Sequence, residues 1–149
     1  MVEVALMAPW IFFLFIGVFD FGVYAYSCIC AQNAARAAAL SNASNGAIDN
    51  TSACLAALAE LNRLPNTAGE TSNCPTTAGT VTDARPVAVW VDKLCQFGCI
   101  ATCADCGVDA AAISARATVV YRTIQLIPIP GVLAGRTTIT RAVEMRYMQ

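Results

Sequence analysis

The sequence predicts an α+β fold, with a long hydrophobic helix over about residues 1–43 and an exposed α+β head over about residues 44–149. Two features of the chain indicate this class. Its apolar residues, 57% of the total against 13% charged, concentrate at the amino-terminal end. Its carboxyl-terminal end carries two segments rich in Thr, Val and Ile, which favour strands. In addition, eight cysteines suit a small head tied by disulfides.

The amino-terminal helix is predicted from an almost uncharged run. Between Val4 and Ala35 the only charged residue is Asp20. At about 1.5 Å per residue, a helix from Ala5 to Tyr26 spans roughly 30 Å, which is the thickness of a bilayer core. The segment is therefore long enough to cross a membrane.

The residues flanking this run leave three interpretations. A cleavable secretory signal would begin with basic residues, whereas here the start carries Glu3 and no Lys or Arg precedes Arg36. A plain signal-anchor helix would not require Glu3 at its tip or Asp20 near its middle. The third interpretation, which we favour, is a helix that lies in the membrane first and later packs against copies of itself, because ionisable groups in apolar segments are functional candidates.

Three residues are expected to weaken the helix. Pro9 removes one backbone donor and crowds the preceding turn, so a kink or local melting is predicted between Met7 and Trp10. Gly17 and Gly22 each weaken a helix by roughly 1 kcal/mol relative to alanine. Beyond Tyr26 the helix becomes rich in alanine, which predicts a face on which the head lies at close range.

A second, short helix is expected after a turn cluster at residues 45–50. Thr51 or Ser52 can cap its amino end, and Pro65 ends it. Its apolar positions recur every three residues and are Leu55, Leu58, Leu61 and Leu64.

Three further segments have strand character. Val87, Val89 and Val91 alternate with smaller or aromatic residues and predict a strand, although a helix beginning at Pro86 is an alternative. Segments 113–123 and 137–146 are predicted to pair antiparallel through the proline- and glycine-containing connection at 126–135.

The cysteines are interpreted first as disulfide partners in an oxidising compartment. Eight cysteines permit 105 pairings, so the sequence does not give the connectivity. Cys28 and Cys30 would lie about 200° apart around a helix, so they cannot bond each other and must reach different partners. The candidates are Cys28, Cys30, Cys54, Cys74, Cys95, Cys99, Cys103 and Cys106.

A metal or iron–sulfur site is the alternative use of the last four cysteines, Cys95, Cys99, Cys103 and Cys106. Nothing around them supports a reaction, and the chain has no histidine to act as a general base or a metal ligand. We therefore expect no metal, no cofactor and no enzymatic activity. Nine Lys and Arg against ten Asp and Glu also argue against nucleic acid as a partner.

The amino-terminal segment resembles a known family. Residues 2–9 read Val-Glu-Val-Ala-Leu-Met-Ala-Pro, and an aromatic and aliphatic run then leads to Phe19-Asp20-Phe21-Gly22. This pattern, over Met1 to about Ala39, resembles the amino-terminal signature of TadE-like pilins, of the tight-adherence branch of type IV pili. The carboxyl-terminal strands, with Pro128 and Pro130 between them, are similar to the closing strands of that family.

The resemblance implies a structural subunit of an extracellular Tad or type IV-like pilus, a homo-oligomeric helical filament for surface attachment. It implies the bacterial inner membrane as the location before assembly, and a prepilin peptidase and pilus assembly machinery as partners. Glu3 is expected to pair with the amino group of an adjacent subunit, and Asp20 to make a contact inside the helix bundle. The alternatives are a minor or priming pilin of a fibre built from another subunit, and a single-pass membrane-anchored exoplasmic binding module.

Overall fold

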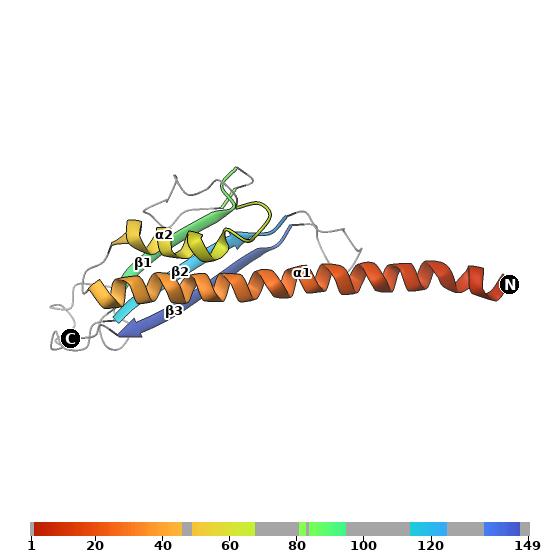
Figure 1. Cartoon of the computed structure of the whole chain (residues 1–149), viewed down its shortest axis with the longest axis horizontal. Helices are drawn as coiled ribbons and strands as arrows, with labels where there is room; N and C mark the ends of the chain where they lie inside the picture. Colours follow the sequence, from red (N-terminus) through yellow and green to blue (C-terminus); the bar gives the residue numbers. More distant parts are fainter. Residues whose placement is uncertain are drawn as a thin grey trace.

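The structure is a computed structural model that describes residues 2–45, 49–67, 81–82, 84–94, 114–124 and 136–146. The fold contains a long helix that projects beyond a small head (Figure 1). This arrangement confirms the predicted α+β class with its long apolar amino-terminal helix. The elements are α1 (Val2–Asn45), α2 (Asn50–Leu61), β1 (Val87–Leu94), β2 (Ser114–Arg122) and β3 (Thr138–Arg146).

The three strands form one antiparallel sheet in the order β1-β2-β3. Tyr121 of β2 is paired with Val87 of β1 on one side and with Ile139 of β3 on the other. The predicted pairing of the two carboxyl-terminal strands is confirmed, and the segment from Val87 is a strand rather than a helix. The sequence did not predict that β1 joins this pair along the free side of β2.

One face of the sheet packs against the two helices. Alternate residues point to the same face of a strand, and on this face β1 and β2 contribute buried side chains at every second position. The carboxyl half of α1 lies against β2 and β3, and α2 lies against α1 and β1. The resulting core contains Val87, Val89, Val91, Ala115, Ala117, Val119, Tyr121 and Ile139 from the sheet.

The carboxyl half of α1 is built into the head through small residues. Ala31, Ala34, Ala35 and Ala38 are completely buried, and their spacing of three and four residues places them along one side of the helix. Because alanine has a short side chain, the backbone of α1 approaches the sheet closely. The predicted alanine face is therefore the surface on which the head is assembled.

α1 is continuous through the three residues expected to weaken it. The helix runs unbroken from Val2 to Asn45 with Pro9 inside, so the local melting predicted between Met7 and Trp10 is not present. A proline removes a single backbone donor, and the hydrogen bonds on either side of it hold the helix. Gly17 and Gly22 likewise lie within regular helix.

Asp49, rather than Thr51 or Ser52, caps α2. Its carboxylate accepts hydrogen bonds from the backbone N–H of Thr51, at 2.9 Å, and from the hydroxyl of Ser52. Within α2, Leu58 and Leu61 are buried, but Leu55 is half-exposed. A period of three drifts around a helix of 3.6 residues per turn, so Leu55 falls away from the face that Leu58 and Leu61 bury.

The connection between the helices is held by a buried asparagine. The amide oxygen of Asn42 accepts a 2.6 Å hydrogen bond from the backbone N–H of Asp49, and its nitrogen donates to the carbonyls of Asp49 and Ala38. Asn42 is almost completely buried. One side chain of α1 thus fixes the residue that caps α2.

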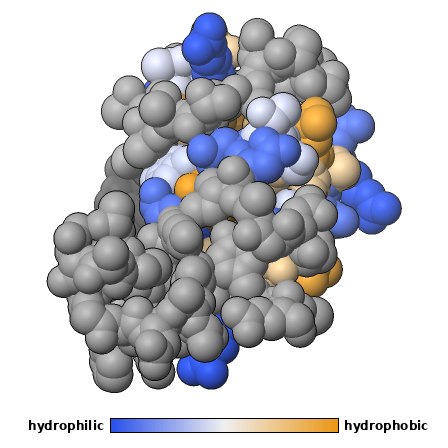
Figure 2. Space-filling model, turned by 90° about the vertical axis from the view of Figure 1, so that its left-hand side faces the viewer, coloured by the Kyte–Doolittle hydropathy of each residue, from blue (hydrophilic) through white to orange (hydrophobic). Residues whose placement is uncertain are grey.

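β3 lies at one edge of the described sheet and is its most exposed strand. Ile139 is buried against the helices, and Val143 and Met145 pack more loosely on the same face. Because alternate residues of a strand share a face, the exposed Arg141 lies on this face too, between Ile139 and Val143. Seen from the end of the head away from the amino terminus, the described surface shows blue hydrophilic side chains beside a few orange ones (Figure 2).

Candidate functional site: the apolar half of the long helix

The amino-terminal half of α1 carries large apolar side chains that nothing in the described structure covers. Trp10 is 74% exposed, Phe15 71% and Leu6 69%. Leaving such side chains in water costs roughly 1.5–3 kcal/mol each relative to burying them. The other large apolar residues exposed in this half are Met7, Ile11, Phe12, Phe13, Leu14, Val18, Phe19 and Phe21.

The helix is long and apolar enough to cross a membrane. The candidate span is Leu6–Ala43, with a most apolar stretch of mean hydropathy 2.0, and only 6% of that stretch is buried. A core helix of a soluble protein of this length would be mostly covered by its own chain. The amino-terminal apolar helix therefore indicates membrane anchoring.

Glu3 lies in the first turn of α1. The structure describes its backbone position and not its side chain. An acidic residue in the first turn of a helix is favoured by the positive end of the helix dipole. Its pairing with a neighbouring amino group remains a prediction.

Asp20 faces the head rather than the exposed side of α1. Only 2% of the residue is exposed, and its Oδ2 atom meets no hydrogen-bond partner among the described residues. Ser27 and Ala31 follow it at intervals of seven and four residues and are also buried, so Asp20 continues the side of α1 that packs on the head. The sequence prediction placed this carboxylate in a bundle of helices and did not foresee that its own head covers it.

A shallow apolar groove lies where α1 leaves the head. Its volume is about 550 Å³, and its floor is one face of α1, formed by Val18, Gly22 and Tyr26 with Phe19 and Val23 beside them. Pro65, beyond the end of α2, and Ile124, after β2, form the walls. None of the described lining residues is charged, so this part of the groove suits an apolar occupant.

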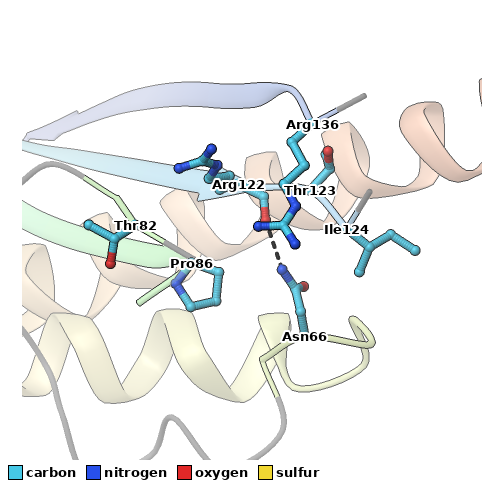
Figure 3. Close-up of a pocket in the computed structure, with 7 residues that line it drawn as sticks. All are labelled: Asn66, Thr82, Pro86, Arg122, Thr123, Ile124 and Arg136. Atoms are coloured by element: carbon cyan, nitrogen blue, oxygen red, sulfur yellow. Dashed lines mark hydrogen bonds between the residues drawn. The ribbon is translucent and has the colours of Figure 1, made fainter. Parts of the chain in front are cut away.

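A second, polar cavity of about 130 Å³ lies in the head (Figure 3). Its polar lining residues include Arg122, Arg136, Thr82 and Thr123. Among the described residues, its lining includes no carboxylate, cysteine or histidine. Asn66, which lines it, donates a 2.8 Å hydrogen bond to the carbonyl of Arg122.

Tyr121 connects the sheet to the chain that follows α2. It is almost completely buried, and its phenol donates a 2.6 Å hydrogen bond to Oδ1 of Asn66. Burial raises the pKa of Tyr121 to about 12. Its role is structural, because at neutral pH it remains a protonated donor.

The structure describes three of the eight cysteines. Cys54 is buried and disulfide-bonded, and its partner lies outside the described residues. Cys28 and Cys30 are free thiols in this structure, so it gives neither of them the disulfide partner that the sequence analysis expected. Cys74 and the four residues of the alternative metal site, Cys95, Cys99, Cys103 and Cys106, lie outside the described residues.

The architecture and the apolar surface together define a class of protein, in which one membrane-length helix is continuous with a small α+β head. Residues 1–40 match the family model of TadE-like protein, and the predicted resemblance is confirmed over this segment. Comparisons with curated proteins and with solved structures find no match. The match suggests a Tad pilus-associated protein with an amino-terminal membrane-anchor helix.

Proposed function

We propose that the chain is a structural subunit of an extracellular Tad or type IV-like pilus filament and polymerises through α1. One observation carries this proposal: the uncovered apolar side chains of α1, from Leu6 to Phe21, form a continuous surface outside the head. Such a surface is stable in lipid or against other apolar helices, but not in water. The α1 helices of other copies of the chain have the same length and the same apolar character, so they can cover this surface.

In the proposed pathway, α1 first holds the chain in the bacterial inner membrane and then enters the core of the filament. Contacts between helices replace contacts with lipid, and the heads coat the outside. Glu3 would pair with the amino group of an adjacent subunit as the helix leaves the membrane, because an acid in an apolar environment gains most from a charged partner. Attachment to surfaces would then depend on the heads.

Electron microscopy of the purified full chain tests the proposal. Filaments built from this chain alone are the expected result and would identify a main subunit. Single copies that require detergent would instead favour a membrane-anchored binding module, and filaments only in the presence of another pilin would favour a priming role. Glu3→Ala is expected to reduce filament yield strongly, with Glu60→Ala, an exposed acid on α2, as the matched control.

A further inference from the structure

We infer that the apolar groove beneath the head receives the exposed segment Leu6–Phe15 of α1 from a second copy of the chain. This inference rests on the proposed function and deepens it, since it names the two surfaces that meet. The groove is lined by Val18, Phe19, Gly22, Val23, Tyr26, Pro65 and Ile124.

The shape of the groove favours a helix. Gly22 lies on the floor, and a Cβ atom added there would meet nothing within 4 Å. Val18, Gly22 and Tyr26 are spaced by four residues and so form one row along α1. A small residue in such a row lets a second backbone come close, which is how helices associate inside membranes.

The exposure along α1 identifies which part of the second copy fits. From Asp20 onward one side of α1 is covered by its own head, as the burial of Asp20, Ser27 and Ala31 shows. Residues 6–15 have no such cover, and their large side chains are 62–74% exposed. Among the described residues, this bare segment of α1 therefore fits a groove that is flanked by Pro65 and Ile124 of another copy.

The chemistry of the two surfaces also matches. Every residue from Leu6 to Phe15 is apolar, as is the groove lining. Leu6, Trp10 and Phe13 recur at four and three residues and present one face of the helix. With both chains inserted in the same direction, the two copies would be offset along the helix axis by roughly 17 Å, the rise of eleven to twelve residues.

Photocrosslinking in the full chain tests this contact. A photoreactive phenylalanine analogue replaces Trp10, and adducts are mapped in cell membranes and in filaments. We expect intermolecular adducts on the groove, at Tyr26, Pro65 or Ile124. The same probe at Phe12, on the opposite face of the helix, should give few adducts there.

Gly22→Leu supplies the blocking variant. The open space above Gly22 means that leucine fills the groove without a clash inside its own chain, and we expect the Trp10 adducts to fall about tenfold, the effect of losing roughly 1.4 kcal/mol. Glu60→Leu adds the same side chain at an exposed position of α2 outside the described groove lining, and should leave the adducts unchanged. Equal thermal unfolding of the two variants would show that both fold.

The outcomes separate this inference from the proposed function. The groove contact would be overturned if filaments form but the adducts map elsewhere on the chain, form with lipid, or persist in Gly22→Leu. Polymerisation would then still stand. If the chain stays single in membranes and forms no filament, both proposals fall. Adducts on the groove that only Gly22→Leu removes would support both.

Discussion

The phenol of Tyr121 and the side-chain oxygen of Asn66 are joined by a 2.6 Å hydrogen bond across 55 residues of chain. The nitrogen of the same amide donates to the carbonyl of Arg122. Asn66, which lies beyond α2, therefore holds the end of the central strand β2 through both the oxygen and the nitrogen of its side-chain amide. This arrangement fixes the wall that Pro65 contributes to the groove.

Tyr121→Phe is expected to destabilise the chain by about 1–2 kcal/mol, because Oδ1 of Asn66 loses its donor. Thermal unfolding in detergent measures the change. Since the pKa of Tyr121 is raised to about 12 by burial, its contribution to stability is complete below pH 10 and disappears as the pH rises through 12. The variant should lack this alkaline decline, whereas an identical alkaline decline in both proteins would contradict the assignment.

Asn42→Ala should destabilise the chain by about 1–3 kcal/mol, because the buried side chain makes the hydrogen bonds that join α1 to Asp49. Chemical denaturation of the full chain in detergent gives the value. Asn62→Ala, at an exposed position just after α2, is the matched control and should change little. Equal effects of the two substitutions would refute the proposed importance of this connection.

The Asp49 cap of α2 predicts that the stability of the chain falls at acidic pH. The hydroxyl of Ser52 and the backbone N–H of Thr51 lower the pKa of Asp49 below its ordinary value of 3.8. Its contribution to stability is therefore present above pH 3.8 and is lost as the pH falls through the lowered pKa. Asp49→Asn keeps a capping side chain without a charge, so the melting temperatures of the two proteins should converge in acid. A difference that does not vary with pH would argue against this role of the carboxylate.

Asp20→Asn is expected to leave the melting temperature of the single chain unchanged or to raise it, because an amide costs less to bury than a carboxylate whose Oδ2 meets no hydrogen-bond partner among the described residues. Filament yield should fall in the same variant if the carboxylate contributes to assembly. Glu60→Gln, on the exposed side of α2, serves as the control for both measurements. A marked loss of thermal stability in Asp20→Asn would show that the carboxylate supports the isolated fold instead.

The sequence predicted those features that depend on local pattern. The uncharged run around Asp20 is sufficient to predict α1, and the strand segments near Tyr121 and Ile139 follow from their composition. The cap of α2 was misassigned because Asp49, Thr51 and Ser52 are all good capping residues and stand almost side by side. Only the geometry of the chain entering the helix selects among them.

The features that the sequence did not predict depend on contacts between distant residues. The pairing of β1 with β2 joins residues such as Val87 and Tyr121, and no local pattern encodes that register. The burial of Asp20 has the same cause, although its spacing to Ser27 and Ala31 carries a signal that could have revealed it. The groove needs Pro65 and Ile124 beside α1, and this proximity arises only in the folded chain.

The charged side chains of β3 disfavour one kind of contact between copies of this protein, the pairing of one strand edge with another. A bare strand edge is a template on which another chain can add a strand, and charged residues on an edge strand prevent this kind of aggregation. Arg141, Glu144 and Arg146 give the described edge such protection. In the proposed filament, neighbouring heads would therefore lie side by side without pairing through the β3 edge, and association would be left to the long helix.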